Sequence, residues 1–548
     1  MVSQEWQALI DEKRAQREAS IPSKWKIPKH VAAKVSPTAS VSAFELLEET
    51  DILSKEEREI TEIHDATALL KLLAAGKVSS LAVTTAFCKR AAIAQQLTNC
   101  LTEIFFDEAL EQARFLDDYL KRSGKPMGPF HWLPISIKDI FMIKGQFAST
   151  GYVSYLKKPK ADENSVIIDI LLEGGAVLYC KTTVPQGLFI MEGYSQVFGQ
   201  TMNPHNLSLG PGGSSSGEGA LVGFRGSILG LGSDIGGSIR APSLCNGVFG
   251  MKLSSDRLPY AKQQELFPKG WPSIVCSLGP HAHSARDLTL FCKSVLTAQP
   301  WRRDSTAYAL PWREVPRKTK LRIGVWADDP SFPVHPPVSR ILAAAVTKLR
   351  EAGHEIITIP NAPSLATAVL TAVRSFGLNK DQAPIKPLRA ANEDLHPALE
   401  ELIGQTFPEG HDPDLSEVWA VNASKEDIRE EWAKVWWADG NALDVLICPG
   451  SRSTAVPHGR YGPPAWTLVW NLLDFPASVV PYLKADKELD TQATDDYDPA
   501  TVHGAPGSIQ IVGWRFQDEE VLQATEIISQ ALYGQLPATP VKSVLNRL

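Results

Sequence analysis

The segment from Gly210 to Arg240 reads GPGGSSSGEGALVGFRGSILGLGSDIGGSIR, and serine and glycine are concentrated in it far beyond the chain average. The apolar run 228–232 has the length and composition of a buried strand. The turn that follows it, Asp234-Ile-Gly-Gly-Ser238, places Ser238 directly after the strand. Two glycines leave the neighbouring backbone N–H groups free of side-chain cover, an arrangement typical of an oxyanion hole. The predicted donors are the N–H groups of Ile235, Gly236, Gly237 and Ser238.

A first alternative for the same segment is a phosphate-binding loop. Such a loop needs Gly-Lys-Ser/Thr, because the lysine neutralises phosphate and the hydroxyl binds magnesium. The chain offers only Gly76-Lys-Val78 and Gly124-Lys-Pro126. The dinucleotide pattern fails as well, since Ile235 stands where the third glycine after Gly230-Leu-Gly232 belongs. The sequence therefore disfavours nucleotide binding.

A second alternative is the nucleophile elbow of an α/β-hydrolase. Gly213-Ser-Ser215-Ser-Gly217 matches GxSxG, with Ser215 as the nucleophile. An elbow follows a strand directly, whereas residues 203–211 have the composition of a loop. The match is also easy to obtain in a run so rich in glycine and serine. We therefore prefer Ser238 as the nucleophile and keep Ser215 as the alternative.

Ser238 needs a base, and a lysine is the best candidate. His281 and His283 are followed by polar, loop-like sequence, which favours surface or structural roles. Lys138 instead ends the apolar run 134–137 and is flanked by Ile135, Ile137 and Ile140. Burial among such residues disfavours the charged form, so the pKa of the amine falls and a neutral base becomes available.

Around this segment the chain alternates short apolar runs with helical stretches. Buried strands are expected at residues 133–137, 176–180, 228–232, 321–325, 445–448 and 508–512. Helices are expected at 65–75, 79–97, 165–173, 337–352 and 519–532, and helix-packing roles are expected for Trp419, Trp432, Trp436 and Trp437. The alternation predicts an α/β protein with a central sheet covered on both faces. A polar helical arm, residues 1–62, precedes a single domain over residues 63–548.

Composition narrows the class of protein further. The 548 residues carry 55 Lys plus Arg and 62 Asp plus Glu, a net charge of −7 that gives no footprint for nucleic acid. Seven scattered cysteines form no CxxC pair, which indicates a reducing compartment and argues against a disulfide framework or a zinc site. Because the sequence also lacks an HExxH pattern, no metal is expected. No secretory signal or transmembrane segment is found, so the expected location is the cytoplasm. The tail Asn546-Arg547-Leu548 gives a weak alternative, the peroxisome.

Taken together, these motifs resemble the amidase signature family. Lys138 after Pro-Ile-Ser-Ile, followed by Ser214 and Ser238 spaced 24 residues apart, matches the family pattern. Further similar motifs are residues 182–186, 198–204, 471–476 and 504–513, and residues 87–100 and 257–262 look like the fungal acetamidase branch. The likeness covers nearly the whole chain. It implies a large central mixed sheet with helices on both faces and a catalytic core at about residues 130–260.

The resemblance also implies a mechanism that needs no cofactor. Lys138 takes a proton from Ser214, which lies in a cis peptide linkage, and Ser214 takes one from Ser238, which attacks the amide carbonyl. Ser215 resembles a supporting donor near the nucleophile, and the pair of Asp234 and Arg240 braces the turn. Leu188 resembles a substrate contact in an apolar pocket. Ser216 departs from the usual glycine and puts the pocket shape in question.

The expected activity is hydrolysis of linear carboxylic amides to acid and ammonia or amine, as in an acetamidase. The partner is then a small-molecule amide with an alkyl or aryl acyl group. An esterase or a transamidase subunit are alternatives in the same fold, although the net charge of −7 disfavours binding of transfer RNA. An inactive relative would be expected to lack Lys138, Ser214 or Ser238. The sequence leaves open whether the protein is a monomer or a homodimer.

Overall fold

A single large sheet runs through the computed structural model, which describes residues 2–264, 266–271, 273–438 and 442–534. Within these residues the sheet has 11 strands in the order β1-β3-β2-β6-β8-β7-β12-β13-β11-β9-β10. The strands are β1 Leu101–Ile104, β2 Pro134–Lys138, β3 Val177–Thr182, β6 Leu229–Asp234, β7 Phe249–Lys252, β8 Ser277–Ala282, β9 Arg322–Val325, β10 Glu355–Thr358, β11 Val445–Cys448, β12 Ala477–Lys484 and β13 Pro506–Val512. A separate ribbon joins β4 Tyr194–Ser195 to β5 Gly199–Gln200. The tail at residues 546–548, on which the peroxisomal alternative rests, lies outside the described residues.

The sheet is mixed, as the family resemblance implied. Strand β2 runs parallel to both β3 and β6, and β6 runs antiparallel to β8. Every strand expected from the apolar runs is present, with small shifts at the ends. The apolar run that ends at Lys138 is thus a central strand, and its neighbour β6 leads into the turn that carries Ser238. Both predicted catalytic segments therefore leave the same region of the sheet.

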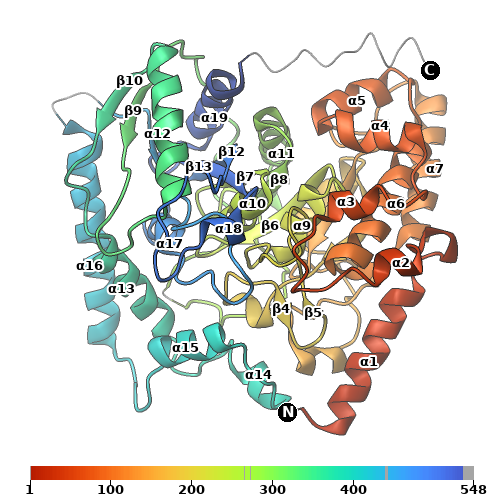
Figure 1. Cartoon of the computed structure of the whole chain (residues 1–548), viewed down its shortest axis with the longest axis horizontal. Helices are drawn as coiled ribbons and strands as arrows, with labels where there is room; N and C mark the ends of the chain where they lie inside the picture. Colours follow the sequence, from red (N-terminus) through yellow and green to blue (C-terminus); the bar gives the residue numbers. More distant parts are fainter. Residues whose placement is uncertain (1, 265, 272, 439–441, 535–548) are drawn as a thin grey trace.

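Helices cover the sheet on both faces (Figure 1). The longer ones are α1 Gln4–Ala19, α4 Lys55–Ile63, α5 Ala66–Ala74, α6 Ser80–Thr98, α7 Phe106–Ser123, α8 Val166–Glu173, α9 Ser216–Gly223, α11 Ala285–Thr297, α12 Pro336–Glu351, α13 Leu365–Gly377, α15 Pro397–Thr406, α16 Leu415–Trp436, α17 Ala465–Leu472 and α19 Asp518–Tyr533. The shorter ones are α2 Lys29–Ala32, α3 Ala43–Leu47, α10 Arg240–Asn246, α14 Lys386–Ala390 and α18 Pro499–Val502. All the helices expected from the sequence are present.

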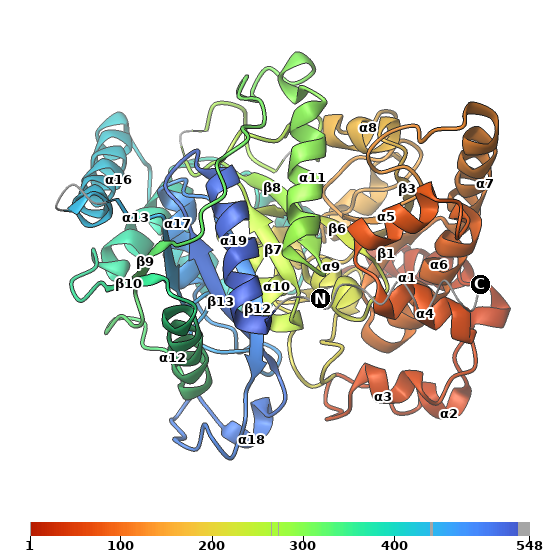
Figure 2. The same ribbon diagram turned by 90° about the horizontal axis from the view of Figure 1, so that it is seen from above.

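Strand β12 shows how the two faces are occupied. The Ser478 hydroxyl lies 2.6 Å from the Thr525 hydroxyl of α19. The next residue, Val479, packs in one cluster with Leu244 of α10. Because successive side chains of a strand point to opposite faces, α19 and α10 cover opposite sides of the sheet. Figure 2 shows α11 beside α19, where the two helices are in contact over β8 and β12.

The N-terminal arm packs on the rest of the chain. The Arg17 guanidinium is buried and donates to the Leu101 carbonyl at 2.9 Å. Lys13 forms a buried ion pair with Glu103 of β1. Further along the arm, Trp25 is buried in the same apolar core as the central strands. The arm is helical as expected, while the division at residue 62 stays a prediction.

Of two local expectations, one holds and the other is wrong in part. His281 lies in strand β8, where it is buried and its Nδ1 lies 3.0 Å from the Ser243 hydroxyl, which agrees with the structural one of the two roles expected for it. Strand β8 was missed because its sequence, Ser-Leu-Gly-Pro-His-Ala, lacks a continuous apolar run. Of the four tryptophans for which core and helix-packing roles are expected, Trp432 and Trp436 are buried, whereas Trp419 and Trp437 are exposed to 65% and 45%. Spacing alone therefore did not decide which face of α16 turns inward.

Candidate active site

Lys138 is the last residue of β2, and its side chain is completely buried. Its Nζ lies 2.8 Å from Ser214 Oγ, 3.0 Å from Ser233 Oγ and 3.1 Å from the Ser233 carbonyl oxygen. Among the described residues, no carboxylate lies within ion-pair distance of this amine. Burial lowers the pKa of Lys138 to about 7, and weaker attraction from Cys276, Asp234 and Glu218 opposes the fall. The direction of this shift agrees with the expectation from the isoleucine neighbours of Lys138.

Ser214 lies in the loop before α9, and the peptide bond between Gly213 and Ser214 is cis. Glycine is required beside it, because a Cβ at Gly213 would come within 2.6 Å of the Ile190 carbonyl oxygen. The backbone at Gly213 therefore packs closely against the backbone of residues 190–192. Ser214 lies between that segment and Lys138 at the end of β2. The cis linkage that the resemblance implied is present.

Ser238 stands on the turn between β6 and α10. The Asp234 carboxylate organises this turn by accepting the N–H groups of Gly237 at 2.7 Å and Ile239 at 3.1 Å. Asp234 also forms a fully buried ion pair with Arg240, at 3.0 Å. Burial opposes ionisation of Asp234, but Arg240 outweighs it and holds the pKa of that carboxyl well below its usual range. The expected bracing role of this pair agrees with these contacts.

The predicted set of oxyanion donors needs one correction. The N–H of Gly237 is taken by Asp234, so in this structure it is not available to a substrate oxygen. The N–H groups of Ile235, Gly236 and Ser238 have no hydrogen-bond acceptor within the described ranges. The turn thus offers three free donors instead of four. The sequence could not reveal this, because it does not show that the Asp234 side chain folds back over its own turn.

The two further serines of the segment lie close to Ser238. The N–H of Ser215 donates to the Ser238 carbonyl at 3.1 Å, and its hydroxyl is buried, with the Ser233 carbonyl 3.5 Å away. Ser215 follows a loop, not a strand, as the argument against a nucleophile elbow supposed. The Ser216 hydroxyl, at the departure from the usual glycine, donates to the Glu192 carbonyl at 3.1 Å. The side chain that Ser216 has in place of the usual glycine is therefore hydrogen-bonded to the backbone of the segment that lines the pocket.

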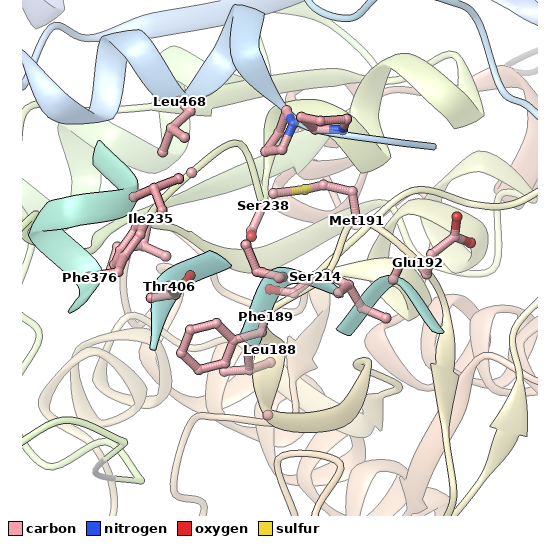
Figure 3. A pocket seen from close by; sticks show the side chains of 18 of the residues that line it. Leu188, Phe189, Met191, Glu192, Ser214, Ile235, Ser238, Phe376, Thr406 and Leu468 are labelled. Carbon is pink, nitrogen blue, oxygen red and sulfur yellow. The ribbon is translucent and has the colours of Figure 1, made fainter. Parts of the chain in front are cut away.

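Ser214 and Ser238 both face a cavity of about 340 Å³ (Figure 3). Most of the other side chains around it are apolar, and several are aromatic. Among them are Leu188, Phe189, Ile235, Phe267, Phe376 and Leu402. Leu188 has a left-handed backbone conformation with φ +65°, directly after Gly187 with φ +62°. The expected contact residue thus lies on the wall of the cavity, and helices α13 and α15 close it from the far part of the chain.

Three polar residues of the site were missed by the sequence reasoning. Ser233 contacts Lys138 through both its hydroxyl and its carbonyl, and its position before Asp234 on β6 was the only available signal. The Thr467 hydroxyl donates to the Gly236 carbonyl at 2.8 Å and supports the turn from α17. Glu218 is fully buried beneath the site. The role of each of these three residues depends on a contact with a segment far away in the sequence, and a single sequence does not show such contacts.

Two kinds of feature are absent from the described residues. No group of three or more His, Cys, Asp or Glu side chains is arranged to hold a metal ion. Over the same residues, none of the helices combines the length and the apolar character needed to cross a bilayer.

The chain was compared with known proteins. Residues 82–522 match the Amidase family. An amidase of Gibberella moniliformis (strain M3125 / FGSC 7600) is 52% identical over 533 residues, which cover 97% of this chain and 100% of that protein. An acetamidase of Emericella nidulans (strain FGSC A4) is 37% identical over 556 residues, covering 96% and 98%. Among solved structures, a fatty acid amide hydrolase superimposes with a TM-score of 0.90 at 32% identity, covering 97% of this chain and 95% of that one.

Proposed function

The chain belongs to the amidase family and is an amide hydrolase, and from this premise we propose that it cleaves linear carboxylic amides through an acyl-enzyme on Ser238. The products are a carboxylic acid and ammonia or an amine. The observation that carries the proposal is the 2.8 Å separation between Ser214 Oγ and the Nζ of Lys138, a buried lysine with no ion-pair partner in the described part of the chain. An amine in that position is suited to accept a proton.

The proposed proton path runs from Ser238 through Ser214 to Lys138. As Ser238 Oγ forms a bond to the carbonyl carbon, its proton passes to Ser214, whose own proton moves to the neutral Lys138 amine. The C–N bond then breaks, and the departing nitrogen takes a proton back through Ser214. Water next attacks the ester, the C–O bond to Ser238 breaks, and the acid leaves. Ser238 recovers its proton and the cycle closes.

Negative charge on the carbonyl oxygen is stabilised in this proposal by the turn after β6. The N–H groups of Ile235, Gly236 and Ser238 lack another acceptor among the described residues, so they are the proposed donors. Asp234 and Arg240 keep the turn in place without touching the substrate. The contribution of such donors to catalysis is large because they are already oriented before the charge develops.

The acyl group of the substrate occupies the apolar cavity in this proposal. Aromatic residues on the cavity wall, such as Phe189 and Phe376, favour an alkyl or aryl acyl group. The proposed reaction is otherwise like that of an acetamidase, which one of the relatives is. Hydrolysis rates for a panel running from acetamide through long-chain amides to arylacetamides identify the preferred acyl group. The proposed location is the cytoplasm, in keeping with the unpaired cysteines of the described residues.

The nucleophile is tested with Ser238→Ala and a covalent probe. The variant is expected to lose amide hydrolysis while keeping the thermal unfolding midpoint of the wild type, because it removes only the attacking oxygen. A fluorophosphonate, followed by peptide mass mapping, should label wild-type protein on Ser238. Label on Ser215 instead would support the nucleophile elbow and refute the proposed assignment.

A further inference from the structure

A buried glutamate beneath the active site has no part in the proton path. Glu218 lies on α9, one turn after Ser214, and is completely buried. The Ser136 hydroxyl of β2 lies 2.6 Å from its Oε2, and the Thr182 hydroxyl at the end of β3 lies 2.9 Å from its Oε1, both within hydrogen-bond distance. The carboxyl group therefore links the helix that follows Ser214 to two strands of the sheet.

The contact between Glu218 and Ser136 lies on the same strand as Lys138, the proposed base. Ser136 and Lys138 are two residues apart on β2, so their side chains leave the same face of the strand. Strand β6 closes the space from the other side, because a Cβ at Gly230 would overlap Glu218 Oε2. The carboxyl group thus lies against three adjacent strands, β3, β2 and β6, and the middle one of these also carries Lys138.

No cation pairs with this carboxyl group. Among the described residues, no lysine, arginine or histidine lies within ion-pair distance of Glu218. The titratable groups around it are Lys138 on β2, Tyr179 and Cys180 on β3, and Cys100 before β1. Burial raises the pKa of Glu218 to about 8, although the Ser136 and Thr182 hydroxyls and Lys138 oppose the rise. The group is therefore mostly protonated at neutral pH.

We propose that Glu218 is a positioning residue for the Lys138 base, acting as a neutral carboxylic acid that fixes β2, β3 and α9 around it without placing a negative charge beside it. The inference rests on the proposed function, because it takes Lys138 as the base. A neutral carboxyl group donates through its O–H to one hydroxyl and accepts through its C=O from the other, so it satisfies both neighbours.

Neutrality matters because of what a carboxylate would do to the lysine. A negative charge close to Lys138 would stabilise the ammonium form and raise the pKa of the amine. The base would then hold its proton at the pH where it must accept one. A protonated carboxyl group gives the same hydrogen bonds without this effect.

The test compares Glu218→Gln with Glu218→Ala over the pH range of activity. The amide of glutamine donates and accepts as a neutral carboxyl group does, so Glu218→Gln should keep kcat/KM within about threefold and its acid limb within about 0.3 pH unit of wild type. Glu218→Ala leaves two buried hydroxyls and a cavity, and should lower kcat/KM by about tenfold or more. Thermal unfolding is recorded for both variants. Should the alanine variant fail to fold, the glutamine variant alone decides.

Glu393→Gln is the matched control. Glu393 is also buried, and burial raises its pKa to about 7 against the opposing hydrogen bonds from the Val153 N–H at 2.7 Å and the Gln186 side-chain amide at 3.2 Å. This variant should leave the acid limb unchanged.

A glutamine variant whose acid limb moves down by about one pH unit would mean that Glu218 is ionised in the working enzyme, and would overturn the proposal. A folded glutamine variant as impaired as the alanine variant, or an alanine variant as active as wild type, would overturn it too. Failure of the proposed function has a different signature, because wild-type protein would then neither hydrolyse the amide panel nor carry fluorophosphonate on Ser238.

Discussion

At the scale of single residues, the decisive group in the proposed mechanism is the Lys138 amine. Its pKa of about 7 means that activity should fall as the pH drops through 7, because protonation removes the proposed base. Lys138→Ala should lower kcat/KM by about 10²–10⁴-fold and flatten this acid limb. Lys138→Arg should be at least as damaging, since a guanidinium does not deprotonate in this range. The measurement is kcat/KM against pH for the three proteins.

A second buried lysine provides the control for this prediction. Lys252 is fully buried, its pKa is lowered to about 8 by burial, and its Nζ donates to the Phe475 carbonyl at 2.9 Å. Lys252→Arg should leave the acid limb in place. If Lys138→Ala keeps near-normal activity with an unchanged acid limb, the proton is accepted elsewhere and the assignment of the base is wrong.

What the sequence could predict at this scale depended on local information. The burial of Lys138 followed from its isoleucine neighbours, and Ser238 followed from its place after an apolar strand. Ser233 and Glu218 were not predicted, because their partners lie on strands whose order in the sheet is not written in a single sequence. The N–H of Gly237 was assigned wrongly for a similar reason, since nothing in the sequence showed that Asp234 would accept it.

At the scale of elements, the turn between β6 and α10 depends on one glycine. Gly237 has φ +129°, and a Cβ there would overlap the Thr467 hydroxyl. Gly237→Ala should therefore lower the free energy of unfolding by about 2 kcal/mol or more and reduce activity together with it. Gly236→Ala is the neighbouring control, because its Cβ would meet only the ends of two flexible side chains, Leu468 at 3.4 Å and Met191 at 3.9 Å. Equal unfolding midpoints for the two variants, measured by calorimetry, would contradict this account.

The strands were easier to predict than the contacts between them. Apolar runs such as 445–448 match their strands because burial on both faces requires continuous hydrophobicity. Strand β8 escaped this rule, since Gly279, Pro280 and His281 interrupt it. A Cβ at Gly279 would overlap the Met251 carbonyl oxygen of β7, so close approach of the two strands selects that glycine. Tertiary contact, not local pattern, determines the sequence there.

At the scale of the whole molecule, the N-terminal arm should contribute to stability and not to chemistry. Arg17→Ala removes a buried charged donor to the Leu101 carbonyl and should lower the free energy of unfolding by about 2 kcal/mol. Glu12→Ala, on the exposed side of the same helix, should change it little. Thermal unfolding of the two variants gives the comparison, with kcat/KM near wild type in both. Arg17→Ala with wild-type stability would show that the arm is only loosely attached.

The whole enzyme should also work without metal ions or disulfides. The proposed chemistry uses two hydroxyls, one amine and backbone N–H groups, none of which requires a Lewis acid. Activity should therefore survive exhaustive chelation and excess thiol, measured in the same amide assay. A large loss that added zinc restores would contradict the proposed mechanism.

The division of the cavity between two parts of the chain has a consequence for evolution. The proposed reacting groups all lie between Lys138 and Ser238, whereas α13 and α15 bring in the far walls from residues 365–406. If the cavity holds the acyl group as proposed, mutations in those two helices can alter which acyl group is accepted without touching the proposed reacting groups. After a gene duplication, the copies can in this way evolve different amide specificities. Substitutions would accumulate in residues 365–406, while residues 138–238 stay under selection for the reaction itself.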